Sequence, residues 1–101
     1  METSLGHFHD LRDESIFPLG QIAITLSALE VVSPTDAGFA LLRHCRGDWG
    51  DVCMEDWRKN DLALEDEKLL FSVHESRSEE VFWIITNADR SGTTIMLPSE
   101  Y

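Results

Sequence analysis

The segment best suited to chemistry is Arg43-His44-Cys45-Arg46-Gly47-Asp48-Trp49-Gly50-Asp51. It places a base, a thiol and two acids beside two flexible glycines, which are the groups that general-base and nucleophilic catalysis use. Neighbouring helical residues point about 100° apart, whereas a Cys-His couple needs both side chains within hydrogen-bond reach. A small enzyme that uses His44 and Asp48 is therefore the weaker hypothesis.

A structural interpretation of the same segment is favoured. Gly47 is well placed to end a helix in a left-handed conformation, and Asp48 or Asp51 can cap the next helix. Trp49 would pack under the turn, while His44 and Arg46 would lie near a helix C-terminus, where cations are favoured. The segment then connects two helices and carries no reaction.

Histidines and cysteines elsewhere could bind a metal. His7 and His9 are two residues apart, and Cys45 and Cys53 are eight apart. Neither spacing matches a structural zinc site, which pairs ligands at each end of a compact knuckle. We therefore expect no metal and no cofactor, and we expect Cys45 and Cys53 to be a reduced pair and not a disulfide.

Acidic residues dominate the stretch from Asp48 to Glu67, where eight acids minus two bases leave a balance of -6. The whole chain has 19 acidic and eight basic residues and a net charge of -11, which argues against direct binding to nucleic acid or to an anionic membrane. The ordinary explanation of such acids is a solvated helix face, and of the net charge that it keeps the protein soluble. Alternatively, carboxylates on one helix face imitate phosphates and occupy a basic channel. The candidate contacts are Asp51, Glu55, Asp56, Asp61, Glu65 and Asp66.

The chain of 101 residues, 43% of them hydrophobic, is sufficient for one core. We expect residues 1–15 to be a flexible extension and residues 16–101 to be a single domain. No secretory signal is recognisable at the N-terminus, and no apolar run approaches the roughly 20 residues that span a bilayer. These features favour a soluble, cytoplasmic protein.

The apolar spacing predicts the elements of an α+β fold. Gln21 to Thr25 is a short strand with Ile22 and Ile24 facing inward, and a helical turn follows from Ser27. A second helix opens at Ser33-Pro34, a capping signature, and ends near Gly47. A third helix is predicted from about Asp51 to Asp66. The predicted buried positions are Phe39, Leu42 and Cys45 in the second helix and Cys53, Trp57, Asn60 and Leu64 in the third.

Three β-rich runs follow the helices, at Leu69 to His74, Val81 to Thr86 and Thr93 to Leu97. Short connections favour an antiparallel meander of these three strands, which forms one sheet covered by helices. Within the middle run we expect Phe82 and Ile84 to face the helices and Trp83 to face outward. The loop from Asn87 to Gly92 has turn residues, although Asp89 and Arg90 could instead pair or face a ligand.

Several islands of this sequence resemble a family of small bacterial proteins that are carried on plasmids and integrative elements. They are Phe17-Pro18-Leu19-Gly20-Gln21-Ile22, Arg43-His44 with Gly47-Asp48-Trp49-Gly50-Asp51, Trp83-Ile84-Ile85-Thr86, Ala88-Asp89-Arg90-Ser91 and Thr93-Thr94-Ile95. The resemblance spans Phe17 to Tyr101, and it departs at Leu26-Ser27, where the family tends to have Pro-Gly. Members are labelled plasmid-related or type I restriction subunit, but this chain has no methyltransferase cofactor loop. The resemblance therefore implies a mobile-element context and no particular reaction.

Acidity and this resemblance together predict an accessory protein that binds and inhibits a host nucleic-acid defence enzyme, of the anti-CRISPR or anti-restriction type. Its partner would be a host or element-encoded protein with a basic surface. The alternative is a dimeric regulatory or assembly module without enzymatic activity, which associates through a sheet edge or through Trp57 and Trp83.

Overall fold

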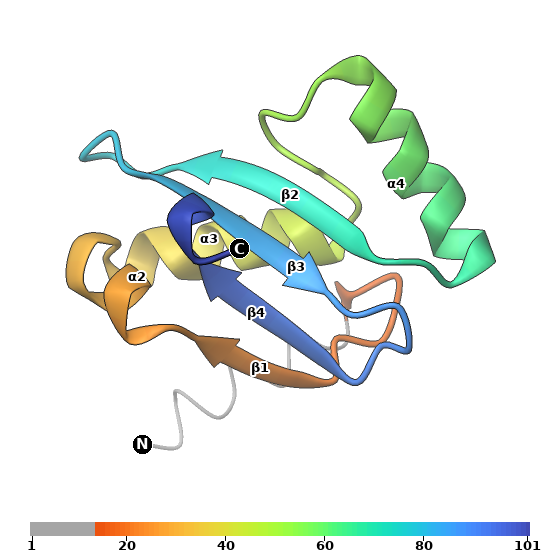
Figure 1. The fold of residues 1–101 in the computed structure, drawn as a ribbon, viewed down its shortest axis with the longest axis horizontal. Helices are drawn as coiled ribbons and strands as arrows, with labels where there is room; N and C mark the ends of the chain where they lie inside the picture. The colour runs from red at the N-terminus through yellow and green to blue at the C-terminus, as the bar shows by residue number, and fades with distance from the viewer. Residues whose placement is uncertain (1–13) are drawn as a thin grey trace.

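The structure is a computed structural model that describes residues 14–101. Helices precede a block of strands, which confirms the α+β class (Figure 1). Residues 1–13 of the expected flexible extension lie outside the described residues. Glu14, which also belongs to that extension, forms an ion pair with Arg46. In chain order the elements are β1 (Gln21–Ile24), α2 (Leu26–Val31), α3 (Pro34–Cys45), α4 (Met54–Asp66), β2 (Leu70–Glu75), β3 (Val81–Thr86), β4 (Gly92–Met96) and the 3-10 helix η1 (Pro98–Glu100).

The four strands form one mixed sheet in the order β1-β4-β3-β2. The three C-terminal strands make the predicted antiparallel meander. β1 pairs with β4 in parallel, and Ile24 lies opposite Ile95. Parallel neighbours need a long connection, which here contains α2, α3 and α4 together with β2 and β3. β1 thus adds a fourth strand, at the edge of the sheet, to the predicted three-stranded meander.

Helix α3 covers one face of the sheet, and η1 lies against the other face (Figure 1). Ala37, Ala40 and Leu41 of α3 pack against Phe82 and Ile84 of β3, which confirms the predicted facing of that strand. On the outer face Trp83 is half-buried. Its ring lies 5.0 Å from that of Phe71 and 5.6 Å from that of Tyr101.

The ends of α3 are those that the sequence predicted. The Ser33 hydroxyl accepts a hydrogen bond from the Asp36 amide at 3.1 Å, and Pro34 occupies the first turn. Gly47 follows the helix with a φ of +83°, in the left-handed region that glycine adopts without strain.

The predicted buried stripe of α3 is wrong at Phe39, whose side chain is 66% exposed. The face that meets the sheet instead carries Ala37, Ala40, Leu41 and His44. These positions have the i, i+3, i+4, i+7 spacing of a single helix face, and Phe39 lies about 200° from Ala37 around the axis. Phe82 and Ile84 fill the space over the sheet, so small residues of the helix face them.

Helix α4 begins at Met54, three residues after the predicted start at Asp51. The Asp51 amide donates to the Val73 carbonyl at 2.8 Å, and the Val73 amide donates to the Trp49 carbonyl at 3.1 Å. Residues 49–51 therefore pair with β2 through an isolated bridge between Gly50 and Val73. Cys53 becomes the N-cap without a side-chain cap bond and is exposed, not buried as predicted.

Two polar side chains fasten α4 to the sheet. Asn60 is buried as predicted, and its amide side chain bonds both the amide (3.0 Å) and the carbonyl (2.7 Å) of Phe71. The Arg90 guanidinium donates to the carbonyls of Ala63 at 2.9 Å and Lys68 at 2.7 Å. The Asp89 carboxylate accepts from the Ser91 amide, as turn chemistry predicts. Arg90 therefore binds the C-terminal end of α4 to the β3–β4 connection.

A second apolar cluster lies where α3, α4 and the N-terminal segment meet. Trp49 is fully buried there, which confirms that it packs under the turn. Cys45 is buried in the same cluster, where its thiol donates to the Leu42 carbonyl at 3.2 Å, whereas Cys53 is exposed. The buried members are Phe17, Leu19, Cys45, Trp49, Ala63 and Leu70.

Candidate functional site

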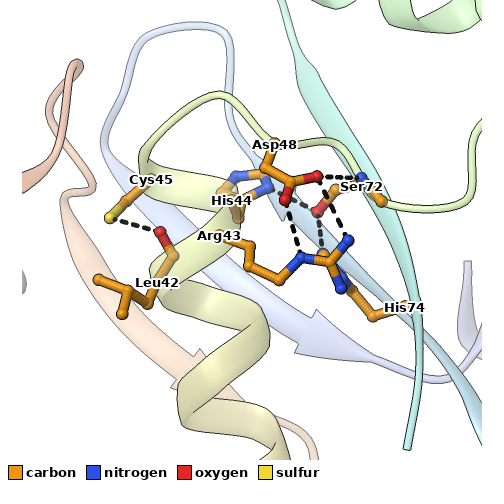
Figure 2. Close-up of polar contacts among 8 residues, drawn as sticks. Leu42, Arg43, His44, Cys45, Asp48, Ser72 and His74 are labelled. Carbon is orange, nitrogen blue, oxygen red and sulfur yellow. Dashed lines mark hydrogen bonds and ion pairs between the residues drawn. The ribbon is translucent and has the colours of Figure 1, made fainter.

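His44, from the segment that the sequence analysis selected as a possible catalytic site, lies in the core of the fold. His44 points from α3 into the protein and is completely buried, not a cation near the helix end. Its Nδ1 lies 2.7 Å from the Ser72 hydroxyl and its Nε2 lies 2.9 Å from the Thr86 hydroxyl. Figure 2 shows His44 reaching from α3 toward Ser72, with His74 beside them. His44 thus joins the helix to two strands.

These contacts belong to a longer buried hydrogen-bond chain. The Thr86 hydroxyl lies 2.8 Å from that of Thr93, which donates to the Leu19 carbonyl at 2.7 Å. At the other end, the Ser72 hydroxyl lies 2.9 Å from Nε2 of His74. We call this set the buried polar chain. In order it runs through Leu19, Thr93, Thr86, His44, Ser72 and His74.

The carbonyl of Leu19 sets the direction of every proton in the buried polar chain. A carbonyl can only accept, so the Thr93 hydroxyl donates its single proton to Leu19. The Thr93 oxygen must then accept from the Thr86 hydroxyl. Thr86 then accepts from Nε2–H of His44. Neutral His44 has a bare Nδ1, which accepts from Ser72. The Ser72 oxygen accepts in turn from Nε2–H of His74, so both neutral rings are Nε2–H tautomers.

This direction leaves His74 with a bare Nδ1 at the end of the buried polar chain. That nitrogen is buried and has no hydrogen-bond partner among the described residues. Gly50 packs directly over the ring, because a Cβ on Gly50 would lie 3.0 Å from Nδ1 and 2.0 Å from the Val73 carbonyl oxygen. Only glycine therefore fits at position 50, where the chain passes over His74.

Burial makes both imidazoles poor bases. Desolvation, with a smaller contribution from His74, lowers the pKa of His44 to about 3. Desolvation, followed by the charge of Arg43, lowers the pKa of His74 to about 4. A general base works best with a pKa near the ambient pH and within reach of a substrate. Ser72 and His44 are both fully buried, so the buried polar chain fastens α3 to the sheet.

The structure does not bring His44 and Asp48 together as a catalytic pair. The Asp48 carboxylate accepts from the Arg43 guanidinium at 2.9 Å and from the Gly50 amide at 3.1 Å (Figure 2). The bond from Arg43 lowers the pKa of Asp48. His44 instead contacts Ser72 and Thr86. Asp48 stabilises the turn, and His44 stabilises the core.

The six predicted contact residues form no ion pair with any residue from 14 to 101. Other acids are neutralised internally, since Glu14, Asp36 and Asp48 pair with arginines. Within the described part of the chain, no salt bridge involves Asp51, Glu55, Asp56, Asp61, Glu65 or Asp66. All of these except half-buried Asp56 are exposed.

The acids of α4 do not form one continuous stripe. Glu55, Glu65 and Asp66 are exposed and occupy the outward side of the helix over roughly 16 Å of its length. Asp56 and Asp61 are about 140° apart around the axis, on the two flanks of the helix. The Asp61 carboxylate accepts from Nε1–H of Trp49 at 3.0 Å and so also supports the fold.

An open depression lies at the start of α4. Its volume is about 430 Å³, and Val52, Met54, Trp57 and Arg58 line it. Val52 and Trp57 are half-buried and pack against the second apolar cluster. Met54 is 71% exposed. The floor of the depression is thus fixed by the core, and its rim faces solvent.

The described residues contain neither a cluster of metal ligands nor a helix that could span a membrane. Among residues 14–101, no three or more His, Cys, Asp or Glu side chains gather to hold a metal ion, and His7 and His9 lie outside that range. None of the helices in the described range has the length and apolar character to cross a bilayer.

Sequence reasoning missed four of the polar side chains that organise the core. Ser72 and His74 share the inward side of β2 with Leu70, and Thr86 and Thr93 are fully buried. The available signal was polar residues at inward positions of otherwise apolar strands, where a buried hydroxyl or imidazole needs a partner. That partner, His44, comes from a distant helix.

Comparisons with known protein families, with curated proteins and with solved structures found no match to this chain.

Proposed function

We propose that this protein acts by binding and not by catalysis, and that the acidic surface of α4 docks onto a basic nucleic-acid-binding surface of a host defence enzyme. By occupying that surface it would exclude the enzyme's DNA or RNA, as an anti-CRISPR or anti-restriction protein does. The resemblance to mobile-element proteins supports this class of target.

The observation that carries the proposal is that, among residues 14–101, no salt bridge involves a carboxylate of α4. Three arginines are already paired with acids elsewhere in the fold: Arg43 with Asp48, Arg46 with Glu14 and Arg77 with Asp36. The Arg90 guanidinium donates to backbone carbonyls. The α4 carboxylates are therefore available to a partner, on a protein with a net charge of -11. Such a surface attracts lysine and arginine over about 10 Å at 0.1 M salt.

The arrangement of the acids selects the contacts within this surface. Glu55, Glu65 and Asp66 face outward and make no hydrogen bond or ion pair with the described residues. Asp61 supports Trp49, and Asp56 is half-buried. Arg58 and Lys59 lie between the outward acids, so α4 meets a mixed basic surface and not a uniform phosphate-binding channel. The outward acids are the residues to change.

The test is competition with nucleic acid. Purified protein is titrated against a type I restriction complex and a CRISPR surveillance complex that each hold labelled DNA, at low and high salt. We expect displacement of DNA from one of these classes, weaker at high salt. The variant Glu55→Lys, Glu65→Lys, Asp66→Lys should inhibit at least about tenfold less at low salt, mainly through slower association.

A matched control separates α4 from net charge. Glu30, Glu75 and Glu80 are exposed on α2 and at the β2–β3 connection, at the end of the molecule away from α4 (Figure 1). Changing them to lysine alters the net charge equally and should leave inhibition almost intact. Equal losses in both triple variants would reject α4 as the contact surface. Failure to displace DNA from either complex would reject this class of target.

A further inference from the structure

We propose that the depression formed by Val52, Met54, Trp57 and Arg58 is the anchor site of the binding surface. It takes one aliphatic or aromatic side chain of a partner protein, and lysines or arginines flanking that side chain pair with the acids around it. This inference rests on the proposed function and specifies the chemistry of the partner.

The depression has the properties of an interface hot spot. Val52 and Trp57 are held by the second apolar cluster, so the pocket exists before binding and little ordering entropy is lost. Met54 is 71% exposed and offers an adaptable apolar contact. A half-buried tryptophan beside an exposed methionine is the composition in which binding energy concentrates.

The surrounding charges determine which side chain enters. Met54, Arg58, Asp61 and Glu65 follow one another at spacings of four, three and four residues, so they lie along one stripe of α4. The stripe therefore runs from the depression to two carboxylates. Glu55 flanks Met54 on the outward side. A basic residue of the partner thus finds acids beside the depression, not within it.

Arg58 makes the depression itself selective for an uncharged group. Its Nη2 lies 3.7 Å from the Met54 sulfur, so its cation stays at the wall. A lysine or arginine entering the depression would meet this like charge, whereas an apolar side chain would not. The fitting occupant is therefore an apolar residue with basic neighbours on both sides.

The experiment uses the full chain and a synthetic peptide with one leucine between two pairs of arginines. A second peptide replaces the leucine by alanine, and a third replaces the arginines by glutamates. Binding is followed by the NMR signals of the Trp57 indole and of the amides of residues 52–58. Loss of the leucine should weaken binding roughly tenfold, and the glutamate peptide should not bind.

The protein variants place the contact. Met54→Ser should also weaken binding of the leucine peptide roughly tenfold. The control Leu26→Ser removes another exposed apolar residue, 80% exposed on α2, and should leave the dissociation constant unchanged. Shifts confined to other residues, no binding at millimolar peptide, or equal effects of the two variants would overturn the anchor site.

The two proposals fail in different ways. If the alanine peptide binds as tightly as the leucine peptide but the α4 lysine variant loses both, the anchor site is overturned and the acidic surface is supported. If the leucine is required but binding ignores salt and the lysine variant, the acidic docking surface is overturned. Loss on both changes, with the expected salt dependence, supports both proposals.

Discussion

Ser72 is the residue on which the buried polar chain depends most. Its hydroxyl donates to His44 and accepts from His74, and all three side chains are buried. Ser72→Ala would leave Nδ1 of His44 and Nε2–H of His74 without partners, and each such group costs about 1–3 kcal/mol. We expect the free energy of unfolding to fall by roughly 3 kcal/mol, measured by chemical denaturation. Ser99→Ala, an exposed control, should change it by less than about 0.5 kcal/mol.

Helices α3 and α4 are held by different means. Helix α3 has a hydroxyl cap at Ser33 and a glycine after its end, both local devices. Helix α4 has no side-chain cap bond and depends on Asn60 and Arg90, which contact distant backbone. The stability of α3 is thus encoded nearby, whereas that of α4 is supplied by the tertiary fold.

The local cap of α3 makes a direct prediction. Ser33→Ala leaves the Asp36 amide without its hydrogen bond and should lower the free energy of unfolding by about 1 kcal/mol. The conservative change Ser33→Thr or Ser33→Asp should restore most of it, because both side chains accept the same bond. Thermal unfolding of the three variants checks this, and an Ala variant as stable as wild type would contradict the role of the cap.

The stability of the whole molecule should depend on pH through its two buried histidines. The pKa is lowered from 6.5 to about 3 in His44 and to about 4 in His74. Well above pH 6.5 both rings are neutral in the folded and the unfolded states, so protonation of the histidines does not reduce the free energy of unfolding. As the pH falls below 6.5, the unfolded chain binds more protons, so the free energy of unfolding falls until the folded pKa values are reached. Each ring adds a slope of up to about 1.4 kcal/mol per pH unit.

A variant isolates this effect from the change in net charge, since weaker repulsion among the acids acts in the opposite direction. His74→Leu removes one titrating ring together with its unpaired nitrogen. We expect its stability, measured by denaturation from neutral pH to about pH 5, to fall less steeply than that of wild type. Parallel pH profiles for the two proteins would contradict the assignment of His74 as a buried neutral base.

Local patterns in the sequence were sufficient for the fold class, the meander, the ends of α3 and the facing of β3. Each depends on neighbouring residues: Ser33 caps its own helix, Gly47 adopts its own left-handed turn, and Phe82 and Ile84 alternate along one strand. The exposed acids of α4 were likewise identifiable from their order along the helix. The contacts of these acids with a partner remain a prediction.

Only the tertiary structure decided which distant groups meet. The parallel pairing of β1 with β4, the exposure of Phe39 and the late start of α4 at Met54 all result from contacts between segments far apart in the chain. His44 shows the physical reason: a histidine after a helical turn has the same local pattern whether it is a solvated cation or a buried neutral ring. Its environment is created when Ser72 and Thr86 arrive from two strands, 28 and 42 residues away. Desolvation then determines its charge.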